Sequence, residues 1–383
     1  MINVAIIGQG RSGRDIHGKY FKSEYNTNYK VVAVVEKDEQ RRVRAEEEYP
    51  GCKSYENYSE LYGRDDIDLV VNATYSDEHY SVTKDLLENG FNVLVEKPMA
   101  RNRYECDNLI RIAKEKNLVL AVFQQSLFGP NFVKTIEVIK SGVLGEVMQV
   151  EVKANNFARR WDWQTLQSRM AGNVYNTGPH PIGHALGFLD YDDNARVEFS
   201  RLGRALNSGD AEDYAKIILT APGKPVVDIE ISSNDAYCPY AFKVIGSKGT
   251  FTCTAKDYKL KYIVDGENPE KPIIFESLKN AEGYPIYCSE NLIAHEEEGK
   301  IENEVFTIGN IKFYKMLYET LTNGTPLIIK PEYAAKIISV IETVHANNPM
   351  PVIYKKKIQL TLFFIFAILY LRCLKYGKII LRK

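Results

Sequence analysis

Short apolar runs alternate with helical patterns in the first third of the chain. Runs rich in β-branched residues predict buried parallel strands at 4–7, 30–35, 67–74, 91–95 and 118–123. Between the later runs, apolar residues recur at helical spacing over 81–89 and 104–117. Because strand and helix alternate with short links, we predict an α/β domain with a doubly wound parallel sheet over residues 1–123.

A different pattern begins after residue 123. An amphipathic helix is predicted at 130–140, and the runs after it alternate apolar and polar positions, as expected for half-buried strands. These runs are 147–153, 215–219, 226–232, 242–245 and 250–255. Residues 124–330 are therefore predicted to form an α+β domain with a large, mostly antiparallel open sheet. A last helix is predicted at 331–347.

Composition excludes some classes of function. The 383 residues suit two domains, and 49 basic against 50 acidic residues give no footprint for nucleic acid. The six cysteines are scattered without C-x-x-C pairs, so neither a zinc cage nor a disulfide framework is expected. Since the N-terminus has no signal-peptide pattern, a cytoplasmic protein is expected.

A glycine motif directly follows the first predicted strand. The sequence Gly8-Gln9-Gly10-Arg11-Ser12-Gly13 has the form G-x-G-x-x-G. In such a motif Gly8 makes the tight turn, Gly10 lets a pyrophosphate approach the backbone, and Gly13 lets the next helix pack on the strand. The N–H groups at that helix's start favour an anion. We therefore predict a Rossmann-type dinucleotide site.

An acidic residue ends the second strand. Glu36 stands 23 positions after Gly13, where an acid hydrogen-bonds the ribose hydroxyls of the cofactor. A carboxylate there repels a 2′-phosphate and favours NAD. The neighbouring Lys37 and Arg41-Arg42 reduce that preference, so NADP stays open.

Four features together resemble one family. The chain is similar to the sugar-type NAD(P)-dependent oxidoreductases named for glucose–fructose oxidoreductase and inositol dehydrogenase, from residue 2 to about 354. The features are the glycine motif with His17 after it, Glu36, Asn72-Ala73-Thr74 followed by His79, and the strand-end tripeptide Glu96-Lys97-Pro98.

The resemblance implies a site. In the family the lysine of the tripeptide, here Lys97, reaches the nicotinamide ribose and the reacting hydroxyl. The family also shows Asp, Gly, His and Asp at positions that are Asn176, Gly178, His180 and His184 here. The expected catalytic residues are Lys97, His180 as general acid/base, and Asn176. The expected cofactor contacts are Gly8, Gly10, Arg11, Ser12, Gly13, Glu36, Lys37, Thr74, His79, Glu96, Lys97 and Gln125.

Two of those four positions depart from the family pattern. An amide at Asn176 can orient substrate or imidazole but cannot take up a proton, although a sub-branch of the family has Tyr-Asn-x-Gly-Pro-His. His184 is expected to pack on its helix. A metal pair of His180 and His184 lacks a third ligand in the sequence, so no metal site is expected.

A sugar, cyclitol or related polyol is the expected substrate. Arg160 and Trp163 are expected to line its pocket with Lys97, Asn176 and His180; the alternative is a core tryptophan and a surface arginine. Besides a dehydrogenase acting on CH–OH donors, two readings stay open. One is an NAD-dependent glycosidase or lyase with transient oxidation, and the other is a non-catalytic NAD or sugar sensor.

The resemblance also implies an oligomer and a first domain that is completed by the last helix. A homo-oligomer, a dimer or tetramer, is expected through the second-domain sheet, and the helix at 331–347 is expected to return to the nucleotide-binding domain. The tail at 355–383 is atypical: three lysines precede fourteen mostly apolar residues and a basic end. Fourteen helical residues span about 21 Å, short of the roughly 30 Å of a bilayer core. A soluble enzyme is expected; the alternatives are an interfacial anchor or sequence from a shifted reading frame.

Overall fold

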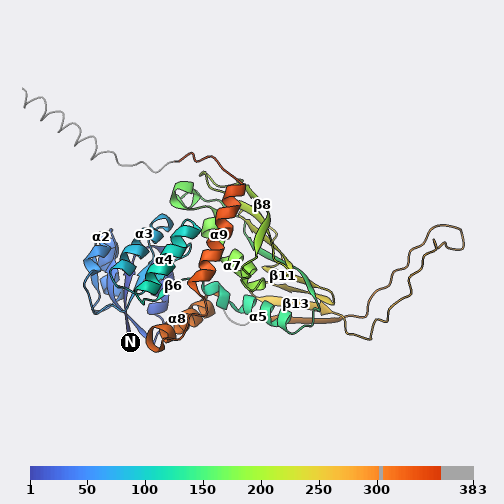
Figure 1. Ribbon diagram of the computed structural model, residues 1–383, viewed down its shortest axis with the longest axis horizontal. Coiled ribbons are helices and arrows are strands. Elements are labelled where there is room, and N and C mark those ends of the chain that lie inside the picture. The colour runs from blue at the N-terminus through green and yellow to red at the C-terminus, as the bar shows by residue number, and fades with distance from the viewer. Residues whose placement is uncertain (302–304, 355–383) are drawn as a thin grey trace, which may run out of the picture.

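The computed structural model describes residues 1–301 and 305–354, which form two domains side by side (Figure 1). The first domain has a six-stranded parallel sheet with the order β3-β2-β1-β4-β5-β6. This order confirms the doubly wound fold. The strands are β1 (Ile2–Ile7), β2 (Tyr29–Val35), β3 (Lys53–Tyr55), β4 (Leu69–Asn72), β5 (Val93–Val95) and β6 (Leu120–Val122).

Helices connect these strands. The first is irregular, because a π-helix (Arg11–His17) precedes a single α-helical turn, α1. Two of the others begin at a capping side chain: Asp38 accepts a hydrogen bond from the Arg41 N–H at the start of α2, and Asn102 accepts one from the Glu105 N–H at the start of α4. The α-helices are α1 (Gly18–Phe21), α2 (Glu39–Glu48), α3 (His79–Glu88) and α4 (Arg103–Glu115).

Strand register brings the site residues to one edge of this sheet. Ile7 lies opposite Val35 and Asn72, and Asn72 lies opposite Val95. The next residue along each of these strands is therefore at the same carboxyl edge: Gly8, Glu36, Ala73 and Glu96. Ligands bind beyond this edge in open parallel sheets.

The second domain has an eight-stranded sheet with the order β14-β13-β12-β11-β7-β10-β9-β8. Among the described strand pairs of this sheet only β7 and β10 are parallel, which confirms the mostly antiparallel open sheet. Strands β8, β13 and β14 were not predicted. The strands are β7 (Val147–Asn155), β8 (Arg196–Gly203), β9 (Tyr214–Thr220), β10 (Val226–Ser232), β11 (Phe242–Gly246), β12 (Gly249–Cys253), β13 (Asp257–Tyr262) and β14 (His295–Lys300).

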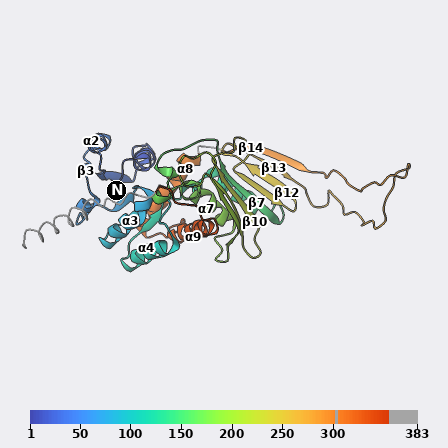
Figure 2. The same cartoon turned by 90° about the horizontal axis from the view of Figure 1, so that it is seen from above.

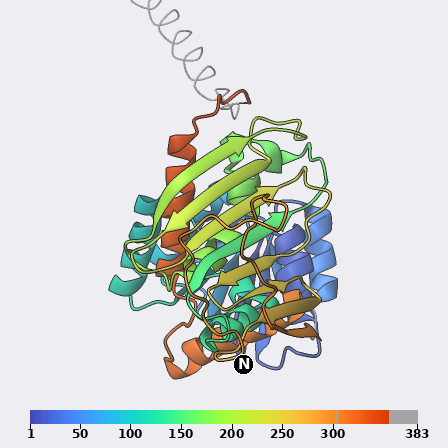
Figure 3. The same ribbon diagram turned by 90° about the vertical axis from the view of Figure 1, so that its right-hand side faces the viewer.

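Helices cover one face of this sheet. The inward positions of its strands are apolar and buried, for example Val150, Ile217 and Ile229. They pack against helices that lie between the sheet and the first domain, while no helix of the described chain covers the opposite face (Figure 3). The helices of this part of the chain are α5 (Pro130–Lys140), α6 (Asn173–Asn176), α7 (Pro179–Phe188), α8 (Val305–Asn323) and α9 (Pro331–Asn347).

The last two helices return to the first domain. Helix α9 packs on α4 and β6 of the first domain and on α7 and β8 of the second, so it lies between the domains (Figure 2). Its bounds are those of the helix predicted at 331–347. Helix α8 adds a contact that was not predicted. Its residues Phe313, Tyr314 and Leu317 are fully buried in the core formed by β1, β2 and β4. The first domain is thus completed by two segments from the end of the chain.

One segment projects far from both domains. Residues 263–294, here called the arm, leave the sheet at β13 and return at β14 as a long ribbon (Figures 1 and 2). Within the described residues no helix is long and apolar enough to cross a membrane. The predictions for the tail at 355–383 fall outside the described residues.

Candidate active site

The glycine motif forms a tight turn against the neighbouring strand. Gly8 has a φ of +92°, and a Cβ on it would lie 2.5 Å from the Ala73 carbonyl oxygen. A Cβ on Gly13 would lie 1.8 Å from the Gly8 carbonyl oxygen, so the helix can pack here only with glycine. Around Gly10, by contrast, a Cβ would meet nothing within 4 Å. Gly8 and Gly13 are therefore required by the close packing of the turn, and the approach of a pyrophosphate to Gly10 stays a prediction.

This turn fits a dinucleotide. No side chain caps the helix that begins at Arg11, and the space around a Cβ on Gly10 is open, so the start of this helix is available to an anion. The Glu36 carboxylate lies next to the turn: Oε2 accepts a hydrogen bond from the Gln9 N–H at 2.8 Å and is 3.6 Å from Arg41. The residues present thus provide an anion site and an adjacent acid for the ribose, while Lys37 beside it is exposed.

A buried network holds the tripeptide at the end of β5. Glu96 Oε1 lies 3.1 Å from His17 Nε2, and His17 Nδ1 lies 2.6 Å from the Tyr314 hydroxyl of α8. Burial acts to raise the pKa of Glu96, but the hydrogen bond and charge of His17, aided by Lys97, lower it to about 2. Glu96 is thus an ionised anchor, and its other oxygen accepts a hydrogen bond from the Lys97 N–H at 3.1 Å.

Thr74 and His79 also hold the edge of the sheet. His79 is 2% exposed, and its ring nitrogens lie 2.7 Å from the Pro98 carbonyl oxygen and 3.2 Å from that of Thr74. The Thr74 hydroxyl donates to Asn72 Oδ1 at 2.7 Å. His79 therefore connects the loop after β4 to the chain that follows Lys97. Its predicted cofactor contact stays a prediction.

Lys97 reaches across to the second domain. Its Nζ donates to the Asn176 carbonyl oxygen at 2.8 Å, so the side chain spans the gap between β5 and α6. Burial lowers the pKa of Lys97; Glu96 opposes this effect, and the charges of Arg11 and Arg160 add to it. Lys97 therefore lies where the glycine turn and the second domain meet.

His180 lies close to Lys97 and is oriented by a serine. Its Nδ1 is 2.9 Å from Ser126 Oγ, and Nε2 has no protein partner within the described residues. Burial, together with repulsion from Lys97 and His184, lowers the pKa of His180 to about 3. In the tautomer that carries its proton on Nδ1, the Nδ1–H group donates a hydrogen bond to Ser126 Oγ. Nε2 then keeps the lone pair that a general base requires.

The two departures from the family pattern have structural contacts. Asn176 Nδ2 donates to the Gln164 carbonyl oxygen at 3.1 Å, so this amide holds the turn after Asp162. His184 stacks on Phe132 with ring centroids 4.7 Å apart, and its Nε2 lies 3.1 Å from the Ser126 carbonyl oxygen. These contacts agree with the packing role that was predicted for His184. Within the described chain no group of three metal-ligating side chains exists.

Residues 160–163 lie at the entrance to this site. Arg160 is exposed and close enough to Lys97 to lower its pKa. Trp163 packs edge-on against Tyr75 of the first domain, with centroids 5.0 Å apart. Trp163 thus contributes to a contact between the domains, and its role toward a sugar stays a prediction.

Three contributors were not found from the sequence. Ser126 orients His180, Tyr75 meets Trp163, and Tyr314 completes the His17–Glu96 network. Gln125, which was predicted, is buried beside Ser126 at the start of a short 3-10 helix, and its Oε1 has no protein partner within the described chain.

The fold and the site define a two-domain, NAD-binding oxidoreductase. Residues 2–124 match the family described as "Oxidoreductase family, NAD-binding Rossmann fold", and residues 132–252 match the "GFO/IDH/MocA C-terminal domain". These regions cover more than half of the chain, which belongs to the GFO/IDH/MocA family of oxidoreductases. The predicted family is confirmed.

Relatives extend over most of the chain. An uncharacterized oxidoreductase of Schizosaccharomyces pombe is 29% identical over 281 residues, 71% of this chain and 75% of the relative. The scyllo-inositol 2-dehydrogenase (NADP(+)) of Bacillus subtilis is 26% identical over 349 residues, 89% of this chain and 92% of that enzyme. The crystal structure of an NAD-binding protein from Listeria innocua superposes with a TM-score of 0.73 at 20% identity, covering 92% and 99% of the two chains, and supports the fold.

Proposed function

We propose that this oxidoreductase oxidises a secondary hydroxyl of a sugar, cyclitol or related polyol with NAD. The observation that carries the proposal is that Lys97 lies close enough to His180 to lower the pKa of its imidazole, while Lys97 is held by the Asn176 carbonyl and His180 by Ser126. The similarity to a scyllo-inositol dehydrogenase supports the substrate class.

The residues divide the chemistry between them. The Lys97 ammonium donates a hydrogen bond to the substrate hydroxyl and stabilises the negative charge that develops on its oxygen. His180 Nε2 accepts the hydroxyl proton, and Ser126 keeps the ring in the required tautomer and orientation. Asn176 orients the substrate. The bound nicotinamide would supply the hydride acceptor, held by the glycine turn and Glu36.

Glu36 supports NAD over NADP, although Arg41 lies 3.6 Å from its carboxylate. The B. subtilis relative uses NADP(+) according to its name, so this preference requires its own measurement. Arg160 and Trp163, at the entrance, are proposed to contact the hydroxyls and the apolar face of the ring.

A panel of inositols and aldoses, assayed with NAD and with NADP by absorbance of the reduced cofactor, tests the proposal. Reduced cofactor that accumulates with a polyol supports a dehydrogenase. Cofactor retained through turnover, with bond cleavage but no net reduction, would indicate the lyase or glycosidase chemistry instead. Binding without any turnover on the panel would favour a sensor.

A further inference from the structure

Three buried carboxylates just before β9 take no part in the proposed reaction. Asp210, Glu212 and Asp213 are 0%, 1% and 0% exposed. Burying a carboxylate is costly unless hydrogen-bond donors surround it. Each of the three accepts hydrogen bonds from backbone N–H groups of other segments, which are those of residues 167, 174, 205–207 and 353–354. These carboxylates therefore hold other parts of the chain in place, and Glu212 holds the part that leads to the candidate site.

Glu212 fixes the start of α6 from two sides. Its Oε1 accepts a hydrogen bond from the Val174 N–H at 2.9 Å, and its backbone carbonyl accepts one from the Asn173 N–H at 2.9 Å. Gly172, which precedes the helix, has a φ of +104°, and a Cβ on it would lie 2.4 Å from Glu212 Oε1. The carboxylate thus occupies the space beside this glycine and pairs with an N–H group that the first turn of a helix leaves without a helical partner.

The other end of α6 holds the lysine of the site. The Asn176 N–H donates to the Gly172 carbonyl at 2.8 Å, and the Asn176 carbonyl accepts a hydrogen bond from the Lys97 ammonium at 2.8 Å. One turn of helix therefore connects the Glu212 carboxylate to the Lys97 ammonium. A shift at the start of this turn would move the carbonyl that holds Lys97.

A histidine of α9 holds Glu212 in turn. His345 Nε2 lies 3.5 Å from Glu212 Oε2, and its Nδ1 lies 2.9 Å from the Ile341 carbonyl oxygen. A carbonyl and an ionised carboxylate can only accept hydrogen bonds, so the ring has to carry a proton on both nitrogens. Burial acts to lower the pKa of His345, but the hydrogen bond and charge of Glu212 raise it above the usual value. His345 is thus an imidazolium paired with a buried carboxylate.

Other charged and titratable groups also face this histidine. Tyr175 of α6 stacks on the His345 ring, with centroids 4.9 Å apart. Arg101, which follows β5, and Glu342 of α9 line a cavity of about 480 Å³ together with these two rings. Glu342 is exposed to solvent, whereas Glu212 is buried. Because a buried charge is screened less, Glu212 determines the charge of His345.

We propose that Glu212, held by His345, is a positioning residue that fixes α6 and, through α6, the Lys97 ammonium. The inference rests on the proposed function, in which Lys97 stabilises the charge that develops on the substrate oxygen. Lys97 does so only when its ammonium is within hydrogen-bond distance of that oxygen, and a displacement of about 1 Å can lower a rate roughly 10²-fold.

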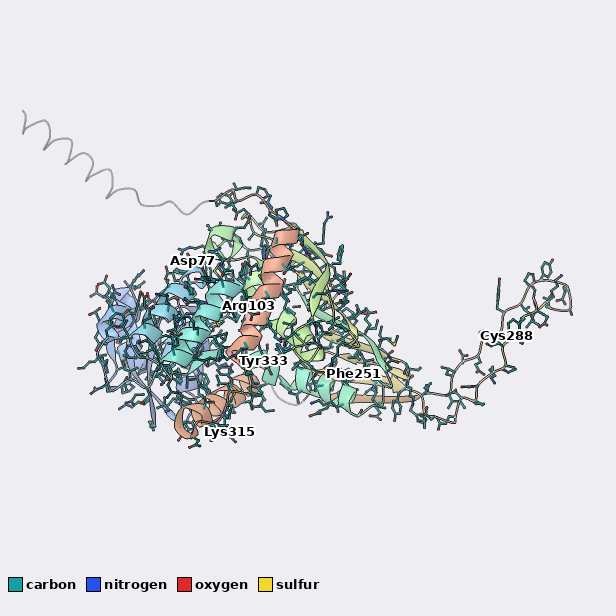
Figure 4. All side chains as sticks on the ribbon, viewed as in Figure 1. Asp77, Arg103, Phe251, Cys288, Lys315 and Tyr333 are labelled. Atoms are coloured by element: carbon teal, nitrogen blue, oxygen red, sulfur yellow. The ribbon has the colours of Figure 1, made fainter. Side chains whose placement is uncertain are left out.

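The first test compares the kinetics of three variants. Glu212→Ala removes the acceptor of the Val174 N–H and should lower kcat about tenfold or more while the Kd for NAD changes less than about threefold. Glu212→Gln keeps an oxygen for that N–H and should recover most of kcat. The matched control is Glu342→Gln, which neutralises a carboxylate of the same cavity and should leave kcat unchanged. Glu342 accepts the N–H of Arg103, at the start of α4 beside α9 (Figure 4).

The second test measures pH dependence. The Glu212–His345 pair is complete while His345 is protonated and is lost as the pH rises through its raised pKa, so kcat of the wild type should fall there. Glu212→Gln should lack this step, because its amide can donate to the neutral ring. NMR titration, with the signal assigned through His345→Gln, should give His345 a midpoint above 6.5 in the wild type and below 6.5 in Glu212→Gln, where burial alone acts. A wild-type midpoint at or below 6.5 would overturn the pair.

Crystal structures separate a failure of this inference from a failure of the proposed function. In Glu212→Ala the distance from Lys97 Nζ to the Asn176 carbonyl oxygen should exceed about 3.5 Å, the limit of a hydrogen bond. Glu212→Asp, one methylene shorter, gives the same test if the alanine variant does not fold. An unchanged distance, or wild-type kcat in Glu212→Ala, overturns the positioning role. A longer distance in an enzyme that oxidises no polyol supports the positioning of Lys97 and refutes the proposed reaction.

Discussion

The glycine turn allows cofactor binding to be separated from folding by two single-methyl substitutions. In Gly13→Ala the new Cβ would lie 1.8 Å from the Gly8 carbonyl oxygen, whereas ordinary contact begins at 3.4 Å. The helix would have to move from the strand by about 1.6 Å, the difference between these distances. In Gly10→Ala the same methyl group would meet no protein atom within 4 Å.

The expected costs differ accordingly. Overpacking of this kind costs about 1–3 kcal/mol of the free energy of unfolding, so we expect Gly13→Ala to lower the melting temperature of the free protein by several degrees. Gly10→Ala should leave it unchanged. With NAD at about 100 times its dissociation constant, the wild type gains about 2.7 kcal/mol of stability. Both variants should lose most of that gain.

Thermal unfolding with and without NAD measures the melting temperature of each variant and its stabilisation by NAD. Calorimetric titration measures the dissociation constant for NAD. Each variant controls for the other, because both add one methyl group within the same turn. If Gly10→Ala keeps the wild-type stabilisation by NAD, then the space beside Gly10 does not receive the pyrophosphate. If Gly13→Ala melts at the wild-type temperature, the close approach of helix and strand does not contribute to the free energy of unfolding.

Further predictions concern the reacting groups and the ribose acid. Lys97→Ala and His180→Ala should each lower kcat about 10²–10⁴-fold while the Kd for NAD changes by less than about threefold; wild-type turnover in either variant would contradict their assignment. Because the pKa of His180 is about 3, its ring should stay neutral as the pH falls through 6.5, and Lys97→Ala should raise that pKa by removing a repulsion. Titration of the imidazole by NMR checks both statements, and a wild-type midpoint near 6.5 would refute them. Glu36→Ala should shift the ratio of kcat/KM for NAD over NADP toward NADP by about tenfold or more; an unchanged ratio would show that Glu36 does not select the cofactor.

The first domain could be predicted because its signals are local. Each buried strand is a short apolar run, and the residues after Ile7, Val35 and Val95 include the glycine turn, Glu36 and Lys97. Parallel register then aligns these strand ends without further information.

The outer part of the second sheet could not be predicted in this way. Within the described residues, β14 is an exposed edge strand that pairs with β13 alone, so its sequence, HEEEGK, has no face to bury and no apolar position. The arm separates it from that partner by 32 residues. Alternation of apolar and polar residues identifies a strand only when one of its faces is buried.

The orienting partners in the site were hidden for another reason. Ser126 and His180 are 54 residues apart, and His17 and Tyr314 are 297 apart. Nothing in the neighbourhood of a serine or tyrosine indicates which distant histidine it will contact. Those pairs follow from the packing of α7 and α8, which the sequence specifies only through the whole fold.

The contribution of α8 to the first core affects how the protein is made on the ribosome. The residues up to 124 contain every strand of the nucleotide-binding sheet, yet Phe123 and Tyr29 pack against Phe313 and Tyr314. During translation these surfaces stay exposed while about 200 further residues are added, roughly 10–40 s at the usual rate. The domain that begins the chain is therefore among the last parts to be completed.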